Sequence, residues 1–108
     1  MIVNQPFKDF NIIWTKDAQK QLKLLVKKDQ EKIAEKVGAL IGDFNSLDIK
    51  KLQGFQDSYR IRSGSYRVVY KVDSSQKILK ITVVEHRKDV YKVLRTLIGI
   101  IGFEWIQH

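Results

Sequence analysis

A β-hairpin with an uncommon charge pattern is predicted between residues 59 and 67, where the sequence reads YRIRSGSYR. If its central glycine and serine form a two-residue turn, Arg62 lies directly opposite Arg67. Arg60 shares that face, because side chains two apart in a strand lie on one side. Like charges directly across a ladder are destabilising, and few acids lie nearby in the sequence. The hairpin therefore needs an anion, and phosphate fits because guanidinium groups match its oxygens two at a time.

The positive charge of the chain is concentrated in its second half. Residues 1–49 carry eight lysines against seven acidic residues, whereas residues 50–92 carry eleven lysines and arginines against four acids. Basic charge confined to one region is typical of proteins that bind polyanions. The alternative is a solvated basic surface that only maintains solubility. Here, however, the charges alternate with tyrosine and valine on predicted strands and do not line a helix.

The chain is expected to form a single domain, residues 1–108, because this length supports one hydrophobic core but not two. It has no cysteine, so neither a disulfide framework nor a thiolate metal site is possible. Residues 1–10 lack the apolar run of a signal peptide, and the apolar segment 93–106 is too short to span a bilayer. We therefore expect a cytoplasmic protein with no membrane association, no metal and no cofactor.

Two short amphipathic helices are predicted in the first half of the chain. Thr15 is a suitable N-cap for the first helix, in which apolar residues continue at helical spacing to Leu25. Asp29 is expected to cap the second helix, in which apolar residues recur from Ile33 to Phe44. The break just before Asp29 makes the pair a helical hairpin.

Strand patterns account for most of the remaining sequence. A short apolar run at 10–14 precedes the helices, and segments 59–63, 66–73 and 78–84 follow a loop at 45–56. The register of the last strand is open by one residue, which decides the face of every side chain on it. With a further helix after that strand, the predicted class is α+β: a helical hairpin on a mostly antiparallel sheet of about four strands, in the order βααβββα. The tyrosines that alternate toward one face are expected in the core: Tyr59, Tyr66 and Tyr70.

Four short segments in this order resemble the RelE/ParE superfamily of bacterial toxin–antitoxin systems. They are KLQG at 51–54, YRIR at 59–62, YRVVY at 66–70 and HRKDVY at 86–91. Each segment alone has little specificity, but the set in this order and spacing is typical of the superfamily. The predicted strand–helix–helix pattern upstream fits the same architecture.

The resemblance implies an activity and a set of partners. RelE-like members enter the ribosome and cut messenger RNA by a metal-free attack of the ribose 2′-hydroxyl on the adjacent phosphate. Such a toxin would inhibit translation, with the ribosome, mRNA and a cognate antitoxin protein as its partners. ParE-like members inhibit DNA gyrase instead, and a non-catalytic RNA-binding protein or decayed toxin is a third alternative.

The resemblance also assigns candidate residues, position by position. Arg62, Arg67 and Arg87 would hold the phosphate and stabilise the charge that develops on it. Tyr91 would stack on a splayed base, or hydrogen-bond the 2′-hydroxyl or the phosphate. The RNA-binding candidates are Arg60, Lys50, Lys51, Lys71 and Lys88.

The proton acceptor of this reaction is not assigned by the resemblance. Well-studied RelE-like toxins have lysines where this chain has Arg60 and Arg62, and arginine cannot be deprotonated in a protein. His86 is therefore the expected general base, because histidine titrates near neutral pH. Its alternative role is to end a strand at the surface. The ribosome could also contribute the base. The weaker candidates are Glu85, Lys50 and Lys51.

Overall fold

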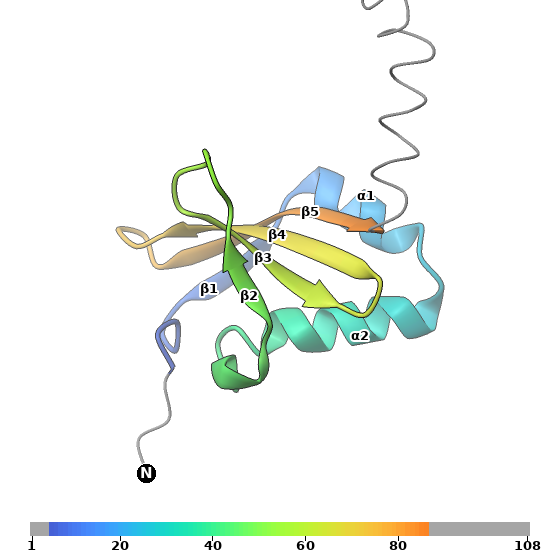
Figure 1. Cartoon of the computed structure of the whole chain (residues 1–108), viewed down its shortest axis with the longest axis horizontal. Coiled ribbons are helices and arrows are strands. Elements are labelled where there is room, and N and C mark those ends of the chain that lie inside the picture. The colour runs from blue at the N-terminus through green and yellow to red at the C-terminus, as the bar shows by residue number, and fades with distance from the viewer. Residues whose placement is uncertain (1–4, 87–108) are drawn as a thin grey trace, which may run out of the picture.

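The computed structural model describes residues 5–86, which form a five-stranded sheet with two helices (Figure 1). In chain order the elements are β1 (Asn11–Trp14), α1 (Lys16–Lys23), α2 (Lys27–Gly38), a 3₁₀ turn (Phe44–Ser46), β2 (Ile49–Lys51), β3 (Ser58–Ser63), β4 (Tyr66–Asp73) and β5 (Ile78–His86). The strand order is β1-β5-β4-β3-β2, with β1 parallel to β5 and the other neighbours antiparallel. The helix expected after the last strand lies outside the described residues.

The predicted α+β class is confirmed, with one strand more than expected. The additional strand, β2, lies in a segment that the sequence pattern indicated as a loop. It contains only three residues, too few for strand alternation to be recognised. Its first residue, Ile49, pairs with Ile61 of β3 and packs against the core. β2 thus extends the predicted hairpin into a three-stranded unit.

The helix caps agree with the sequence for α1 and differ for α2. Thr15 caps α1 as predicted, because its Oγ1 accepts a hydrogen bond from the backbone N–H of Ala18 at 3.1 Å. The prediction that Asp29 caps α2 was wrong, since this helix begins earlier, after Val26, with no side-chain cap. Asp29 lies in the first turn, where negative charge is favourable, and its carboxylate accepts a hydrogen bond from the Tyr66 hydroxyl at 2.9 Å.

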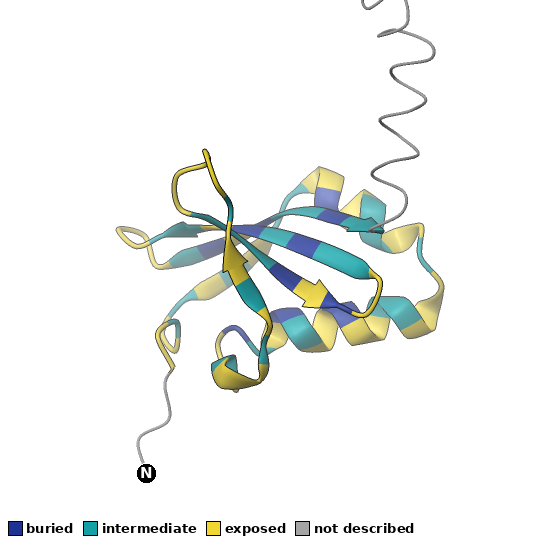
Figure 2. Cartoon of the chain, viewed as in Figure 1, coloured by how far each residue is buried: buried dark blue, intermediate teal, exposed yellow. Residues whose placement is uncertain are grey.

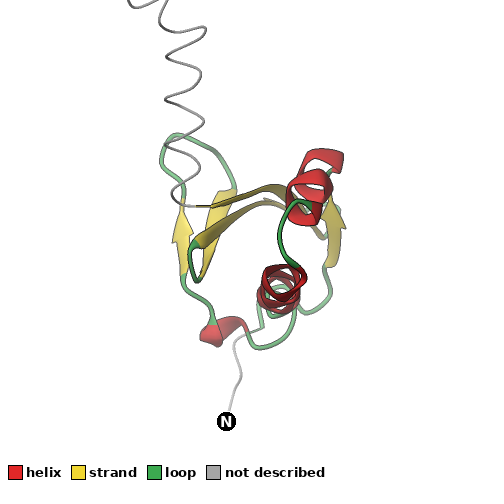
Figure 3. Cartoon of the chain, turned by 90° about the vertical axis from the view of Figure 1, so that its right-hand side faces the viewer, coloured by secondary structure: helices red, strands yellow, loops and turns green. Residues whose placement is uncertain are grey.

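The core lies between the sheet and the two helices, which cover the same face of the sheet (Figures 2 and 3). Tyr70 is buried there, as predicted, and stacks on Tyr59 with ring centroids 5.6 Å apart. Burial, and then the neighbouring Tyr59, raise the pKa of Tyr70 well above its usual range. Tyr59 and Tyr66 are half-buried against this core. The buried aliphatic residues of the sheet are Ile61, Val68, Leu79, Ile81 and Val84.

A β-bulge in β5 resolves the register that the sequence left open. Val69 of β4 pairs with Val83, but its neighbour Tyr70 pairs with Ile81, so Thr82 is an extra residue in the ladder. The Thr82 hydroxyl donates a hydrogen bond to the carbonyl of Val69 at 3.3 Å. The extra residue reverses the alternation of side chains along β5. Before the bulge the even-numbered side chains point away from the helices, and after it the odd-numbered ones do.

Leu79 and Leu24 provide a matched test of this core. Leu79 is fully buried in β5, whereas Leu24 is 86% exposed after α1. We expect Leu79→Ala to lower the free energy of unfolding by about 2–5 kcal/mol, because it removes buried methyl groups and leaves a cavity. Leu24→Ala should change it by no more than about 0.5 kcal/mol. Urea denaturation measures both, and equal losses would contradict the assigned core.

Candidate nucleic-acid interface

One face of the sheet points away from α1 and α2 and is here called the open face (Figure 3). It carries most of the positive charge of the strands. The ladders pair these cations with one another: Lys50 is opposite Arg60, Arg62 is opposite Arg67, and Lys71 is opposite Lys80. Strand alternation explains the clustering, because the residues between these cations face the core. The open face is therefore a basic surface that extends over β2, β3, β4 and β5.

Arg62 and Arg67 face each other across the β3–β4 hairpin, as the sequence predicted. Their side chains are 47% and 42% exposed, so both guanidinium groups are accessible to a ligand. Arg60 lies on the same face, two residues from Arg62, and its side chain is only 12% exposed. The hairpin turn contains Gly64 at φ +59°, a left-handed conformation that glycine adopts without strain. The turn thus fixes the strand pairing in which the two exposed arginines lie opposite each other.

Asp48, just before β2, interacts with two of these arginines. Its Oδ1 lies 3.6 Å from Nη1 of Arg60, and its Oδ2 lies 3.9 Å from Nε of Arg62. The Asp48 carbonyl also accepts a hydrogen bond from the backbone N–H of Arg62 at 3.1 Å. Because the Asp48 side chain is 59% exposed, these long ion pairs are solvent-screened and weak.

Glu85 interacts with the third arginine. Nε of Arg67 donates a hydrogen bond to Oε1 of Glu85 at 2.7 Å, and Nη2 of Arg67 donates to the same oxygen. The two residues are partners in the β4–β5 ladder, and the bulge at Thr82 places Glu85 on the open face. The expectation of few acids near the hairpin was therefore wrong. Two carboxylates lie beside three guanidinium groups, which still leaves one positive charge in excess.

His86, the predicted general base, lies on the other face of the sheet. It is the ladder partner of Tyr66, and the two rings meet edge to face with centroids 5.0 Å apart. The bulge is again the cause, since an uninterrupted alternation would have placed His86 on the open face. His86 and the arginines therefore lie on opposite faces of the sheet.

The remaining candidates divide into those on the open face and those elsewhere. Lys50 and Lys71 are exposed on the open face. Lys51 pairs with Tyr59, so it lies on the face of the sheet that is turned toward the helices. Lys80 is also on the open face and was not among the candidates. Its signal in the sequence was a charge interrupting an apolar strand. The candidates that lie outside the described residues are Arg87, Lys88 and Tyr91.

Two further findings concern the described part of the chain. Among residues 5–86, no three histidine, aspartate or glutamate side chains lie together as metal ligands do. Neither of the two helices has the length and apolar character needed to cross a membrane.

Comparison with known proteins agrees with this architecture. Residues 12–91 match the family described as the ParE toxin of the type II toxin–antitoxin system parDE. The chain belongs to the RelE/ParE toxin family. The superfamily resemblance inferred from the four sequence segments is confirmed.

Individual relatives of this RelE/ParE toxin are RelE proteins of archaea. Toxin RelE3 of Methanocaldococcus jannaschii is 44% identical over 45 residues, which are 42% of this chain and 49%, about half, of RelE3. RelE1 of the same organism is 33% identical over 86 residues, covering 77% of this chain and 96% of RelE1. A chain of the crystal structure of the archaeal RelE–RelB complex from Pyrococcus horikoshii OT3 superposes with a TM-score of 0.62 and 30% identity, covering 72% of this chain and 94% of that chain.

The opposed arginines of this toxin should make its stability depend on anions. We expect inorganic pyrophosphate to raise the melting temperature, because it relieves the repulsion between Arg62 and Arg67 and binds only the folded state. Arg62→Gln should reduce this rise, whereas Lys20→Gln, an exposed lysine of α1, should leave it unchanged. Differential scanning calorimetry over a pyrophosphate series measures the effect. Equal rises in melting temperature for the wild type, Arg62→Gln and Lys20→Gln would show that the hairpin does not bind the anion.

Proposed function

We propose that this toxin is a ribosome-dependent endoribonuclease that cuts messenger RNA and so inhibits translation. The proposal is supported above all by the opposition of Arg62 and Arg67 on the open face, with Arg60 beside them. RNA cleavage by the 2′-hydroxyl needs fixed cations around a phosphate that gains negative charge in the transition state. Guanidinium groups held by a rigid hairpin supply this without reorganisation.

The proposed reaction uses the RNA itself as nucleophile. The ribose 2′-oxygen forms a bond to the adjacent phosphorus while the bond from phosphorus to the 5′-oxygen breaks. The products are a 2′,3′-cyclic phosphate and a 5′-hydroxyl, whose proton comes from water. Arg62 and Arg67 bind the non-bridging oxygens. Arg67 contacts Glu85 through its Nε–Nη2 edge, so its Nη1 edge points elsewhere and suits a phosphate oxygen.

The proton released by the 2′-hydroxyl is assigned to Glu85. Among the candidates that the sequence provided, Glu85 is the acid on the open face and lies in contact with Arg67. Its side chain is 24% exposed, so it can reach a bound strand while part of its hydration is removed. His86 is not assigned this role, because as the ladder partner of Tyr66 it lies on the other face of the sheet. Glu85 therefore both orients Arg67 and accepts the proton.

A cognate antitoxin is the second proposed partner. The superposed Pyrococcus horikoshii chain comes from a RelE–RelB complex, and a RelB–RelE antitoxin–toxin complex from Methanococcus jannaschii also matches, with a TM-score of 0.61 and 29% identity. The open face of this chain has an excess of positive charge. An acidic antitoxin segment that orders on binding would neutralise it and block access of RNA.

Gyrase inhibition is the alternative function, and the ParE description of the matching family favours it. The two toxin activities share this fold, so architecture does not separate them. The arginines do, because RNA cleavage requires their charge at the open face, whereas inhibition of a protein target needs no phosphate clamp.

Substitution of the opposed arginines tests the proposed activity. Without antitoxin, induction of the wild type should arrest growth and produce new 5′ ends inside translated regions. Arg62→Ala and Arg67→Ala should each lower cleavage by roughly 10²–10³ because each removes a cation from the phosphate. Lys20→Ala on α1 is the charge-matched control and should remain toxic. Growth arrest that persists in both arginine variants, with loss of DNA supercoiling, would support gyrase inhibition instead.

Glu85 and His86 are neighbours on opposite faces, which makes them a matched pair for the proton acceptor. Glu85→Gln should slow single-turnover cleavage of messenger RNA on programmed ribosomes by roughly 10²–10⁴, the usual contribution of a general base, without weakening RNA binding. His86→Gln should cleave at a rate close to the wild type, provided that its melting temperature shows an intact fold. Slow cleavage by His86→Gln together with wild-type cleavage by Glu85→Gln would instead assign the general base to His86.

A further inference from the structure

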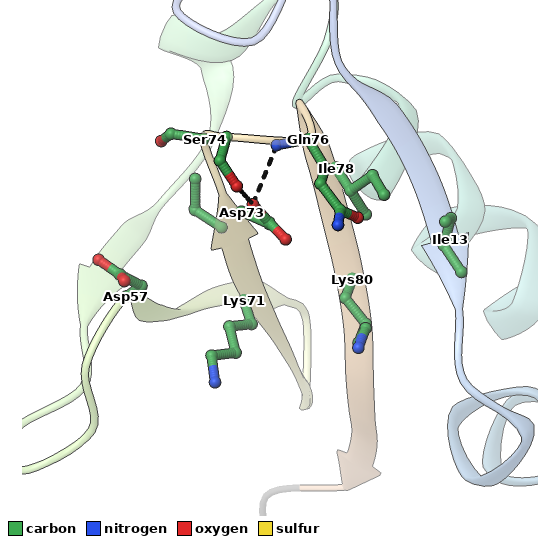
Figure 4. Close-up of a pocket in the computed structure, with 10 residues that line it drawn as sticks. Ile13, Asp57, Lys71, Asp73, Ser74, Gln76, Ile78 and Lys80 are labelled. Atoms are coloured by element: carbon green, nitrogen blue, oxygen red, sulfur yellow. Dashed lines mark hydrogen bonds between the residues drawn. The ribbon is translucent and has the colours of Figure 1, made fainter.

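A second basic site lies at the opposite end of the open face from the hairpin turn. Lys71 of β4 and Lys80 of β5 are ladder partners, and both are exposed (Figure 4). They border a hollow of about 670 Å³ at the β4–β5 turn, which is also lined by Ile13, Asp57 and Asp73. The hollow thus joins two opposed lysines to the edge strand β1.

Within the described residues this lysine pair forms no close ion pair, although two carboxylates, Asp57 and Asp73, line the same hollow. Neither Lys71 nor Lys80 forms an ion pair within 4.0 Å in the 5–86 segment, where the ion pairs found involve arginines. Asp73 is engaged in the turn, since its Oδ1 accepts hydrogen bonds from the Ser75 hydroxyl at 2.7 Å and the Gln76 N–H at 3.1 Å. These hydrogen bonds are the main cause of its lowered pKa, and the charge of Lys80 adds to it. Two cations opposed in a ladder therefore favour an anionic ligand.

The surface between the two basic sites is apolar. Val69 and Val83 are ladder partners on the open face, between the arginine hairpin and the lysine pair. Arg67 and Lys71 are four positions apart along β4, a distance of roughly 13 Å at about 3.3 Å per residue. Two clusters of cations flanking an apolar strip match a single-stranded nucleic acid, whose phosphates repeat along the chain and whose bases and riboses offer apolar surface.

We propose that Lys71 and Lys80 form a second phosphate subsite, which binds the backbone of a single RNA strand a short distance from the bond that is cut. The proposal rests on the proposed function, since it extends the path of the same RNA across the open face. Lysine suits the role because its flexible stem and compact charge hold a phosphate without selecting a base sequence. The arginine hairpin holds the scissile phosphate, and the lysine pair anchors the strand.

The subsite predicts that binding depends on RNA length. The probes are 2′-O-methyl oligonucleotides of three and ten nucleotides, which cannot be cleaved, and binding to the full chain is measured by fluorescence anisotropy at several salt concentrations. For the ten-nucleotide probe, Lys71→Gln/Lys80→Gln should reduce the slope of log K against log salt by about 1.4, because two phosphate contacts are lost at about 0.7 each. The three-nucleotide probe, which spans only the arginine hairpin, should bind the variant and the wild type equally.

The control variant is Lys16→Gln/Lys20→Gln, which removes two exposed lysines from α1 and should bind both probes as the wild type does. An unchanged salt slope for the lysine-pair variant, with normal binding by the wild type, would overturn the subsite and leave the proposed nuclease function standing. Failure of the wild type to bind either probe would overturn the subsite, whereas the nuclease function is judged separately, by the mapping of new 5′ ends. Weakened affinity for the antitoxin, with an unaltered RNA slope, would overturn the subsite too, by assigning the lysine pair to the protein partner.

Discussion

The register of the β4–β5 ladder determines which chemistry is available to the arginines of this toxin. One extra residue, Thr82, shifts every side chain that follows it to the other face of the sheet. As a result a carboxylate, Glu85, meets Arg67, and an imidazole, His86, meets Tyr66 against the helices. A bulge of this kind re-aims side chains without altering the number or order of strands. The same fold can therefore present different acids and bases on one surface.

The open face balances two opposing demands. The proposed binding of a polyanion requires concentrated positive charge, yet opposed cations destabilise the ladder that carries them. Asp48 and Glu85 reduce this cost in the absence of a ligand. The two pairs made by Asp48 are long and partly exposed, so an incoming phosphate can replace them at little energetic cost, while Glu85 keeps one edge of Arg67. Asp48 thus acts as an exchangeable counter-charge, and the two carboxylates together leave the three arginines with one positive charge in excess.

The sequence was most informative where a local signal determined the geometry. The Gly64 turn set the pairing of Arg62 with Arg67, and Thr15 began α1 as expected. It was least informative where tertiary pairing decided the outcome. A strand as short as β2 has no detectable period, and a bulge inserts a residue that alternation cannot reveal. The misplaced His86 follows from that single residue, since the types of side chain were recognised but their faces were not.

The place of β5 in the sheet has a consequence for how the toxin is made. In the described residues β1 pairs only with β5, the strand that follows all the others in the chain, and β5 also borders β4. β5, which joins β1 to β4, is therefore synthesised after both of its neighbours. β1 can pair only when this strand is present, and the paired residues lie some 67 positions apart, as Asn11 and Ile78 do. A nascent chain that ends before β5 has no complete sheet, and Glu85 has not yet been added to it. The sheet, and with it the open face, is therefore complete only once β5 has been synthesised and has paired with β1 and β4.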